Sequence, residues 1–368
     1  MSEFSFIQKL LQKDVKETIK AHISGTDYKP VVVEIDPTTY CNLNCKECVN
    51  KDLLNQSAFS VQALESIIKN LRKANVRNII FIGGGEPLVY PEIEYILRLC
   101  KSEGIAVGLV TNGLLLAKYA EVISETVSWV RVSLDAGSRE TYMEIKGMDV
   151  FEEVLQGIKK VCSQPTKIKV GCSFLVIESK DAEGNVWSNV DELIKAAQVV
   201  QKAGCDYFEF KPLVNTKHDL YQYTDETMQK IREATQELQA RTDVPRIIYP
   251  KSIDSILSGI YTQPKAYHNC PMCYLRALIT PHGIYPCPHK RGVEERRIEE
   301  SFDVPAEYWL SKERIEKIDQ LIDPCKDCNF FCVRNDSNLF LHSVIAFMEK
   351  GIDILELYKE YELEDYFI

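Results

Sequence analysis

Between Val31 and Leu213 the sequence repeats one pattern six times: a short apolar run, a turn signal and a stretch with helical spacing. The apolar runs are rich in β-branched and aromatic residues, as in parallel strands buried on both faces; they begin at Val31, Asn78, Ile105, Trp129, Ile168 and Tyr207. The intervening segments place apolar residues at i, i+3 and i+4, which indicates amphipathic helices, in Val61–Ala74, Ile93–Ser102, Val150–Cys162 and Val190–Ala203. Right-handed crossovers wind such units into a parallel sheet. Because about eight units close a full barrel, the pattern predicts an α/β fold with an open, partial (β/α)6 TIM-like barrel.

The rest of the chain is arranged around this barrel. We expect an N-terminal helix in residues 1–30, the barrel core in 31–224, a helical connector in 225–265, a cysteine-rich module in 266–336 and a helical tail in 337–368. Loops that follow parallel strands meet at the carboxyl ends of those strands, so we expect the chemistry there.

The charge of the 368-residue chain narrows the range of partners. Its formal net charge is -10, whereas binding to nucleic acid or to an anionic membrane needs an excess of Lys and Arg, so we expect neither partner. No apolar run approaches the roughly 18–20 residues that span a bilayer, and the start MSEFSFIQKL lacks the features of a secretory signal. We therefore expect a cytoplasmic protein whose 13 cysteines stay reduced and available to metals.

Three of these cysteines, Cys41, Cys45 and Cys48, follow the first predicted strand directly. Thiolates are the usual ligands of a cubane iron–sulfur cluster. Three of them leave one iron open to a small molecule, as catalytic metals often are. A zinc knuckle would need a fourth ligand that no nearby His or Cys supplies, and a disulfide is disfavoured in a reducing compartment.

This motif and its position resemble those of the radical S-adenosylmethionine (radical SAM) superfamily. The resemblance implies that Cys41, Cys45 and Cys48 ligate a 4Fe–4S cluster, and that the amino and carboxylate groups of S-adenosylmethionine chelate the fourth iron. Family members commonly have an aromatic residue before the last cysteine, where this chain has Glu47. The departure affects contacts around the adenine of the cofactor and removes no ligand.

Three further landmarks of the family close the next three strands in order. They are Gly83-Gly84-Gly85-Glu86-Pro87, Thr111-Asn112-Gly113 and Ser133-Leu134-Asp135. An ordinary turn explains any one of them, but their order matches the family over about residues 31–213. The resemblance implies that the cofactor is bound by Gly83, Gly84, Gly85, Glu86, Asn112, Ser133 and Asp135.

A second group of cysteines lies near the end of the chain, at Cys270, Cys273, Cys287, Cys325, Cys328 and Cys332. Gly283 predicts a hairpin turn before Cys287. The group resembles the SPASM or twitch extension of the same superfamily, which implies at least one auxiliary 4Fe–4S cluster. Its six cysteines fit neither the seven usual in SPASM domains nor the four of twitch domains. We expect ligands from Cys270 or Cys273, from Cys287, and from two of the last three; a second cluster and a zinc ribbon remain open.

The other four cysteines, Cys100, Cys162, Cys172 and Cys205, lie in or beside apolar stretches and are expected to be buried thiols.

The resemblance also implies a reaction. An external one-electron donor such as flavodoxin or ferredoxin reduces the first cluster, S-adenosylmethionine is cleaved to a 5′-deoxyadenosyl radical, and the radical takes a hydrogen atom from the substrate. An auxiliary cluster would accept an electron from the substrate or orient it. We expect substrate contacts at Lys211, Glu209 and Arg276, with further candidates at Tyr274, His282, His289, Lys290 and Arg291. Glu209 and Lys211 share one face of their strand by alternation, and a structural ion pair is the alternative interpretation.

Two classes of substrate stay open. About thirty residues precede the first strand, which is short for a peptide-recognition domain, so we favour a small polyhydroxylated molecule such as a sugar, aminocyclitol or nucleotide-sugar. The alternative is a peptide or protein side chain, as for maturases of ribosomal peptides and of sulfatases. A non-catalytic iron–sulfur or zinc scaffold would not need the cofactor landmarks.

Overall fold

The computed structural model describes residues 6–180, 183–213, 223–248, 264–330 and 332–359. Its main sheet has the strand order β11-β10-β1-β2-β3-β4-β5-β8-β9, and every neighbouring pair is parallel except β10 with β11. The strands are β1 (Val32–Ile35), β2 (Asn78–Phe81), β3 (Ala106–Thr111), β4 (Trp129–Ser133), β5 (Lys169–Val176), β8 (Tyr207–Pro212), β9 (Arg246–Ile248), β10 (Arg276–Thr280) and β11 (Gly283–Tyr285). A separate antiparallel hairpin joins β6 (Glu178–Lys180) and β7 (Val186–Ser188).

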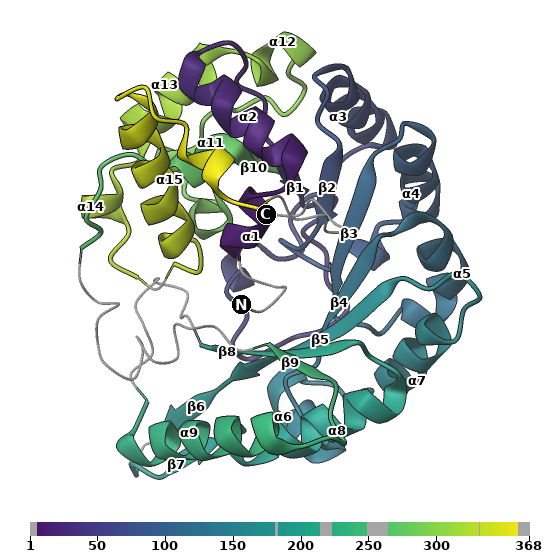
Figure 1. Ribbon diagram of the computed structural model, residues 1–368. Coiled ribbons are helices and arrows are strands. Elements are labelled where there is room, and N and C mark those ends of the chain that lie inside the picture. The colour runs from purple at the N-terminus through teal and green to yellow at the C-terminus, as the bar shows by residue number, and fades with distance from the viewer. Residues whose placement is uncertain (1–5, 181–182, 214–222, 249–263, 331, 360–368) are drawn as a thin grey trace.

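The six predicted strands are β1 to β5 and β8, and the expected partial barrel is confirmed. Figure 1 shows the sheet curving around a central space, with helices on its outer side. Those helices are α3 (Val61–Lys73), α4 (Ile93–Ser102), α5 (Leu116–Thr126), α6 (Arg139–Lys146), α7 (Phe151–Cys162) and α8 (Leu193–Ala203). No helix in the described ranges is long and apolar enough to cross a bilayer.

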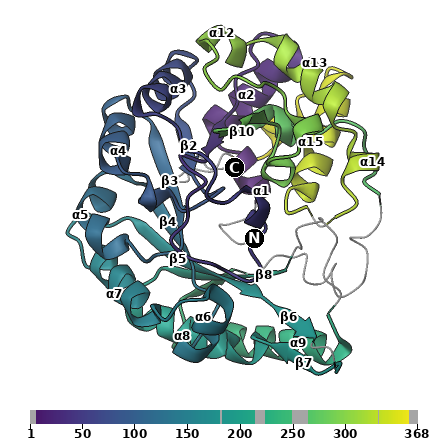
Figure 2. The same ribbon diagram turned by 180° about the vertical axis from the view of Figure 1, so that it is seen from behind.

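The two faces of the sheet belong to different hydrophobic clusters. Val33 of β1 packs with Leu64 and Ile68 of α3 on the outer face. Val32 packs instead with Leu10 on the inner face, together with the N-terminal helices α1 (Phe6–Leu10) and α2 (Lys13–Ser24). Figures 1 and 2 both show α1 inside the ring of strands. The leading segment is therefore two helices, and the first of them lies inside the barrel.

Two glycines make room for aromatic rings on this inner face. A Cβ atom added to Gly108 of β3 would lie 2.3 Å from the indole of Trp129, and one added to Gly171 of β5 would lie 2.1 Å from the ring of Tyr207. The two rings thus cover the neighbouring strands where a side chain would otherwise stand. We call Trp129 and Tyr207 the aromatic floor of the barrel. Helix α1 lies on the same face of the sheet.

The C-terminal part of the chain closes one edge of the barrel. The hairpin expected at Gly283 is present as β10 and β11, and β10 pairs in parallel with β1. The sequence did not predict that pairing, which extends the barrel sheet and covers the otherwise open edge of β1. Around it lie α11 (Pro271–Leu275), α12 (Ala306–Trp309), α13 (Lys312–Leu321), α14 (Pro324–Asp327) and α15 (Asn335–Met348). The connector contains α9 (Asp225–Ala240), which begins after the N-cap Thr224.

Candidate functional site

The three cysteines of the first motif lie on the loop that leaves β1, and all are partly exposed. Burial raises the pKa values of the Cys41 and Cys45 thiols above their ordinary range. The loop is held from the end of α6, where the Ile145 carbonyl accepts from Lys46 N at 3.0 Å and the Lys146 carbonyl accepts from Asn44 N at 3.3 Å. The thiols are thus presented on a backbone that is fixed at two points between Cys41 and Cys48.

The glycine segment after β2 packs directly against this loop. A Cβ atom on Gly85 would lie 2.2 Å from the Tyr40 carbonyl oxygen, so only glycine fits that approach. The backbone amide of Glu86 donates to the same oxygen at 2.8 Å. Asn50 lies at the far end of the cysteine loop, and its side-chain Nδ2 donates to the Gly83 carbonyl at 2.8 Å. The segment and the loop therefore form one rigid unit.

The Glu86 side chain joins the end of β2 to the end of β3. Its buried carboxylate accepts from Thr111 Oγ1 at 2.7 Å, from the Asn112 amide at 2.7 Å and from the Leu88 amide at 3.0 Å. Burial raises the pKa of Glu86, and these donors oppose the shift. The side chain of Asn112 then reaches back to the cysteine loop, where Nδ2 donates to Asn42 Oδ1 at 2.7 Å and lies 4.0 Å from the sulfur of Cys41.

The end of β4 contributes Ser133, which is partly exposed, and the buried Asp135. One carboxylate oxygen of Asp135 pairs with Lys146, and the other accepts from the Leu175 amide at 2.7 Å. Although burial opposes it, Asp135 holds the pKa of Lys146 above its ordinary value, and Lys146 also interacts electrostatically with Cys45. Asp135 thus positions the lysine beside the cysteine loop.

The three thiols of this loop fit an iron–sulfur cluster. Cys41, Cys45 and Cys48 lie near enough to interact electrostatically with one another. A cubane takes one thiolate at each of several irons.

In the second cysteine group Cys273 is buried and the other five cysteines are partly exposed. Cys273 lies between Cys270 and Cys287 and shares hydrogen bonds with both thiols. Cys328 and Cys332 interact electrostatically with Cys270 and Cys287, and burial raises the pKa values of both thiols to about 12. The Asn338 side chain of α15 contacts Cys270 Sγ at 3.3 Å through its amide nitrogen. The backbone amide of Cys325 donates a hydrogen bond to Asp323 Oδ1 at 3.1 Å.

A buried ion pair connects the two cysteine groups. Arg291, four residues after Cys287, donates to Asp36, which directly follows β1. Burial raises the pKa of Asp36 to about 6, although Arg291 opposes that shift. Nearby, His282 Nε2 lies 3.1 Å from the Ser57 hydroxyl. Arg291 and His282, two candidates for substrate contact, therefore have partners within the chain.

The three main candidates for substrate contact lie in the barrel interior. Lys211 Nζ lies 2.9 Å from Glu209 Oε2, and Arg131 Nη1 lies 3.5 Å from the same oxygen. Arg276 pairs with Glu34 of the neighbouring strand β1. Sequence reasoning missed Arg131 and Glu34, although each is a single charge within an apolar run.

Part of the chain matches a known family by sequence. Residues 35–181 match the family model described as Radical SAM superfamily. This stretch contains the first cysteine group and the landmark segments that end β2, β3 and β4. A GTP 3′,8-cyclase of Aliarcobacter butzleri is 29% identical over 157 residues, which is 41% of this chain and 48% of the relative. The chain spans about half the length of the curated relatives that it matches first.

Solved structures extend the likeness beyond residues 35–181. SuiB of Streptococcus suis, bound to its precursor peptide SuiA, superposes with a TM-score of 0.63 at 15% identity, covering 83% of this chain and 71% of SuiB. The enzyme anSMEcpe, with AdoMet and the Cp18Cys peptide, gives a TM-score of 0.58 at 15% identity. That match covers 90% of this chain and 100% of the other. At this identity the comparison shows a shared fold, which includes the C-terminal cysteine-rich region.

Three remaining candidates lie outside the barrel interior. The Tyr274 hydroxyl bonds Asp319 of α13. The His289 ring packs against Phe330 at a tilt of 41°, with ring centroids 4.5 Å apart. Lys290 Nζ donates to the Asp327 carbonyl at 2.9 Å. The last two contacts pack the turn after Cys287 against the segment that carries Cys328.

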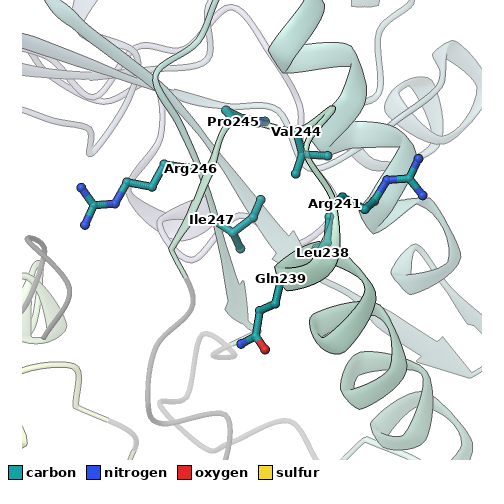
Figure 3. A pocket seen from close by; sticks show the side chains of 7 residues that line it. All are labelled: Leu238, Gln239, Arg241, Val244, Pro245, Arg246 and Ile247. Atoms are coloured by element: carbon teal, nitrogen blue, oxygen red, sulfur yellow. The ribbon is translucent and has the colours of Figure 1, made fainter.

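One cavity of about 370 Å³ lies far from these groups, between the end of α9 and the start of β9. Figure 3 shows Arg241 and Arg246 pointing away from each other at its rim. Arg241 is paired with Glu237 and Asp243. The cavity adjoins the amino end of β9, which is opposite to the end where the loops of the radical SAM domain meet, so it is not the catalytic site.

Proposed function

We propose that this protein cleaves S-adenosylmethionine reductively at a 4Fe–4S cluster held by Cys41, Cys45 and Cys48, and that it abstracts a hydrogen atom from a side chain of a peptide or protein. The observation that carries the reaction is the joining of three thiols, the glycine segment and Asn112 at one end of the barrel. When bound, the cluster and S-adenosylmethionine together supply a carbon radical.

The residues of the chain would bind and orient these groups. The thiols of the loop after β1 would hold the cluster. The backbone of Gly84 and Gly85, with Ser133 at the end of β4, would receive the polar ends of the cofactor. Glu86 would act indirectly, because its carboxylate is used to hold Thr111 and Asn112. Asp135 would likewise act through Lys146.

The second cysteine group would hold an auxiliary 4Fe–4S cluster. Support comes from the contacts that join Cys270, Cys273 and Cys287 and from the electrostatic interactions of Cys328 and Cys332 with them. The Arg291–Asp36 pair would fix this cluster relative to the barrel. In that place it can take up an electron from the substrate or orient it.

The fold favours a peptide over the small polyhydroxylated molecule that the sequence favoured. SuiB and anSMEcpe were each solved with a bound peptide, and anSMEcpe is matched over its whole length. This is an argument from fold alone. A small phosphorylated molecule remains the second candidate, because the sequence relatives of the radical SAM domain are GTP 3′,8-cyclases.

The reaction is tested with anaerobically reconstituted protein, a strong reductant and S-adenosylmethionine. We expect slow release of 5′-deoxyadenosine without substrate, and its loss in Cys45→Ala. The matched control is Cys162→Ala, since Cys162 lies on α7 away from the cysteine loop. Wild-type protein that holds its clusters and releases no deoxyadenosine would contradict the proposed reaction.

A further inference from the structure

The inner face of the barrel can be assigned from its hydrophobic clusters. Along β1, Val33 packs with the outer helices and Val32 packs with the N-terminal helices inside. Side chains alternate along a strand, so Glu34 shares the inner face with Val32. The same alternation, relative to outer residues such as Val130, Phe208 and Ala277, assigns four more charged side chains to the inner face: Arg131, Glu209, Lys211 and Arg276.

These five side chains and Arg334, which precedes α15, form what we call the charged belt. Arg334 interacts electrostatically with Arg276 and Glu34 on one side of the barrel and with Arg131 on the other. It also interacts with Lys211. The members of the belt therefore lie near enough to interact with one another, although they come from β1, β4, β8, β10 and the C-terminal module.

Positive charge exceeds negative charge in the belt by four side chains to two. Glu209 is shared by Lys211 and Arg131, and Glu34 is paired with Arg276. Burial and the nearby Arg131 lower the pKa of Lys211. The cations of the belt thus outnumber its two carboxylates. Uncompensated buried charge is unfavourable, and an anion beside these cations would relieve it.

One guanidinium nitrogen of Arg276 has no hydrogen-bond acceptor among the described residues. Its side chain is 7% exposed, one guanidinium nitrogen pairs with Glu34, and Nη1 is buried without a hydrogen-bond partner among the described residues. The second oxygen of Glu34 is buried without a partner in the same part of the structure. A ligand that carries an oxyanion beside a hydroxyl or amino group would satisfy both atoms.

The belt lies between the aromatic floor and the loops of the radical SAM site. Glu34 stands two residues before Asp36, and Arg131 stands two residues before Ser133 and two after Trp129. Along the barrel axis the order is therefore floor, belt and loops. A molecule whose reacting carbon lies beside the loops would extend its far end onto the belt.

We propose that the charged belt binds an oxyanion of the substrate, a carboxylate or a phosphate group, and so orients the substrate below the cofactor loops. The inference rests on the proposed function for the direction in which the substrate lies. An acidic side chain of a peptide and a phosphate of a small molecule share this chemistry, and guanidinium groups bind both.

The test uses the anaerobic holoenzyme with S-adenosylmethionine bound, titrated with inorganic phosphate and, separately, with acetate. We expect one of the two anions to bind at millimolar concentration, and Lys211→Gln to weaken its binding at least tenfold. Stronger binding of phosphate supports a phosphorylated substrate, and stronger binding of acetate supports an acidic peptide. Lys211→Gln leaves Glu209 with Arg131, so no carboxylate loses its last partner.

Two controls make the result specific. Lys312→Gln removes one exposed lysine of α13, paired with Glu316, and should leave anion binding unchanged. Glu34→Gln combined with Arg276→Gln removes a whole pair without leaving an unpaired charge, and should weaken binding like Lys211→Gln. The proposal is overturned if wild type binds neither anion, if Lys211→Gln and Lys312→Gln bind equally, or if Lys211→Gln loses S-adenosylmethionine affinity instead. Release of 5′-deoxyadenosine by wild type tests the proposed function separately.

Discussion

Arg291 donates two hydrogen bonds to Asp36, from Nε to Oδ2 at 2.6 Å and from Nη2 to Oδ1 at 3.1 Å. Both side chains are buried, at 8% and 1% exposure. Arg291 lies four residues after Cys287 of the second cysteine group, and Asp36 lies five residues before Cys41 of the first. A single bidentate pair thus connects the two groups.

Arg291→Met should therefore destabilise the protein strongly. It leaves the Asp36 carboxylate buried without its cation, and breaking a buried pair in this way costs about 3–5 kcal/mol. The pair is ionised at pH 8, because the pKa of Asp36 is about 6. The measurement is anaerobic urea unfolding at pH 8.

The double variant Asp36→Asn/Arg291→Met should recover much of the loss, because it leaves no uncompensated charge. The exposed pair Arg139–Asp149 gives the matched control, and Arg139→Met should leave the urea midpoint unchanged. Equal midpoints for Arg291→Met and Arg139→Met would show that the buried pair does not hold the two parts together.

Iron content should separate the two cysteine groups. Replacing Cys328 and Cys332 together by Ser should remove about four irons per chain, the content of one cubane. The first group lies on a different loop, so release of 5′-deoxyadenosine should continue at the wild-type rate. Iron analysis and product analysis on the same preparation measure both effects.

Cys100→Ala is the control for loss of a buried thiol, since Cys100 is fully buried in the core on α4. Its iron content should equal that of wild type. Binding of a metal site can drive folding, so circular dichroism of the double variant must match wild type. A folded double variant with unchanged iron would rule out Cys328 and Cys332 as ligands.

His22 should make the protein less stable in mild acid. Burial lowers the pKa of His22 from 6.5 to about 4. The nearby Arg314 and the Lys29 amine lower the pKa further. The Lys29 carbonyl, which accepts from the ring at 2.7 Å, and the Asp27 carboxylate act in the opposite direction. The unfolded chain binds a proton near pH 6.5 and the folded chain only near pH 4. The stabilising effect of neutral His22 is thus present above pH 6.5 and is lost as the pH falls towards 4.

At pH 5 this loss should amount to about 1–2 kcal/mol, from 1.36 kcal/mol for each unit between the two pKa values. His22→Gln keeps a donor for the Lys29 carbonyl and cannot titrate. The difference in unfolding free energy between pH 7 and pH 5 should therefore be smaller in His22→Gln than in wild type. The same difference in both proteins would show that His22 titrates normally.

Much of the fold was predictable because its strands appear in the sequence as short apolar runs. The runs at Val31 and Asn78 became β1 and β2, which are buried at every residue. The run at Trp129 became β4, which is buried at every second residue. The hairpin at Gly283 was predictable from its turn residue, whose φ is 125°. The pairing of β10 with β1 was not, because a local pattern does not record which distant strand will cover an edge. The domain boundaries drawn from the sequence stay predictions.

The candidate site divides in the same way. The cysteines and glycines follow local motifs and could be named in advance. Glu34 and Arg131 each look like one stray charge in an apolar run, and only the curvature of the sheet brings them near Arg334. Lys211 was found because alternation placed it beside Glu209. Charges that meet across a barrel are fixed by closure of the fold and not by spacing along the chain.

The final prediction concerns the contact between the glycine segment and the cysteine loop. In Gly85→Ala the new Cβ would lie 2.2 Å from the Tyr40 oxygen and 2.5 Å from the carbonyl carbon of Thr39. Both atoms belong to the backbone, so the loop itself must shift, and Cys41 follows Tyr40 directly. We expect release of 5′-deoxyadenosine to fall at least tenfold, with loss of iron from the first group.

Gly104→Ala separates this effect from ordinary backbone strain. Gly104 has a φ of +69°, and a Cβ atom there meets nothing within 4 Å. That variant should lose about 1–2 kcal/mol through its left-handed backbone and keep full iron and full cofactor cleavage. If Gly85→Ala cleaves S-adenosylmethionine as fast as Gly104→Ala, the close packing of the two loops is not needed to position the cluster. If only Gly85→Ala fails, the Tyr40–Gly85 contact sets the place of the first thiol.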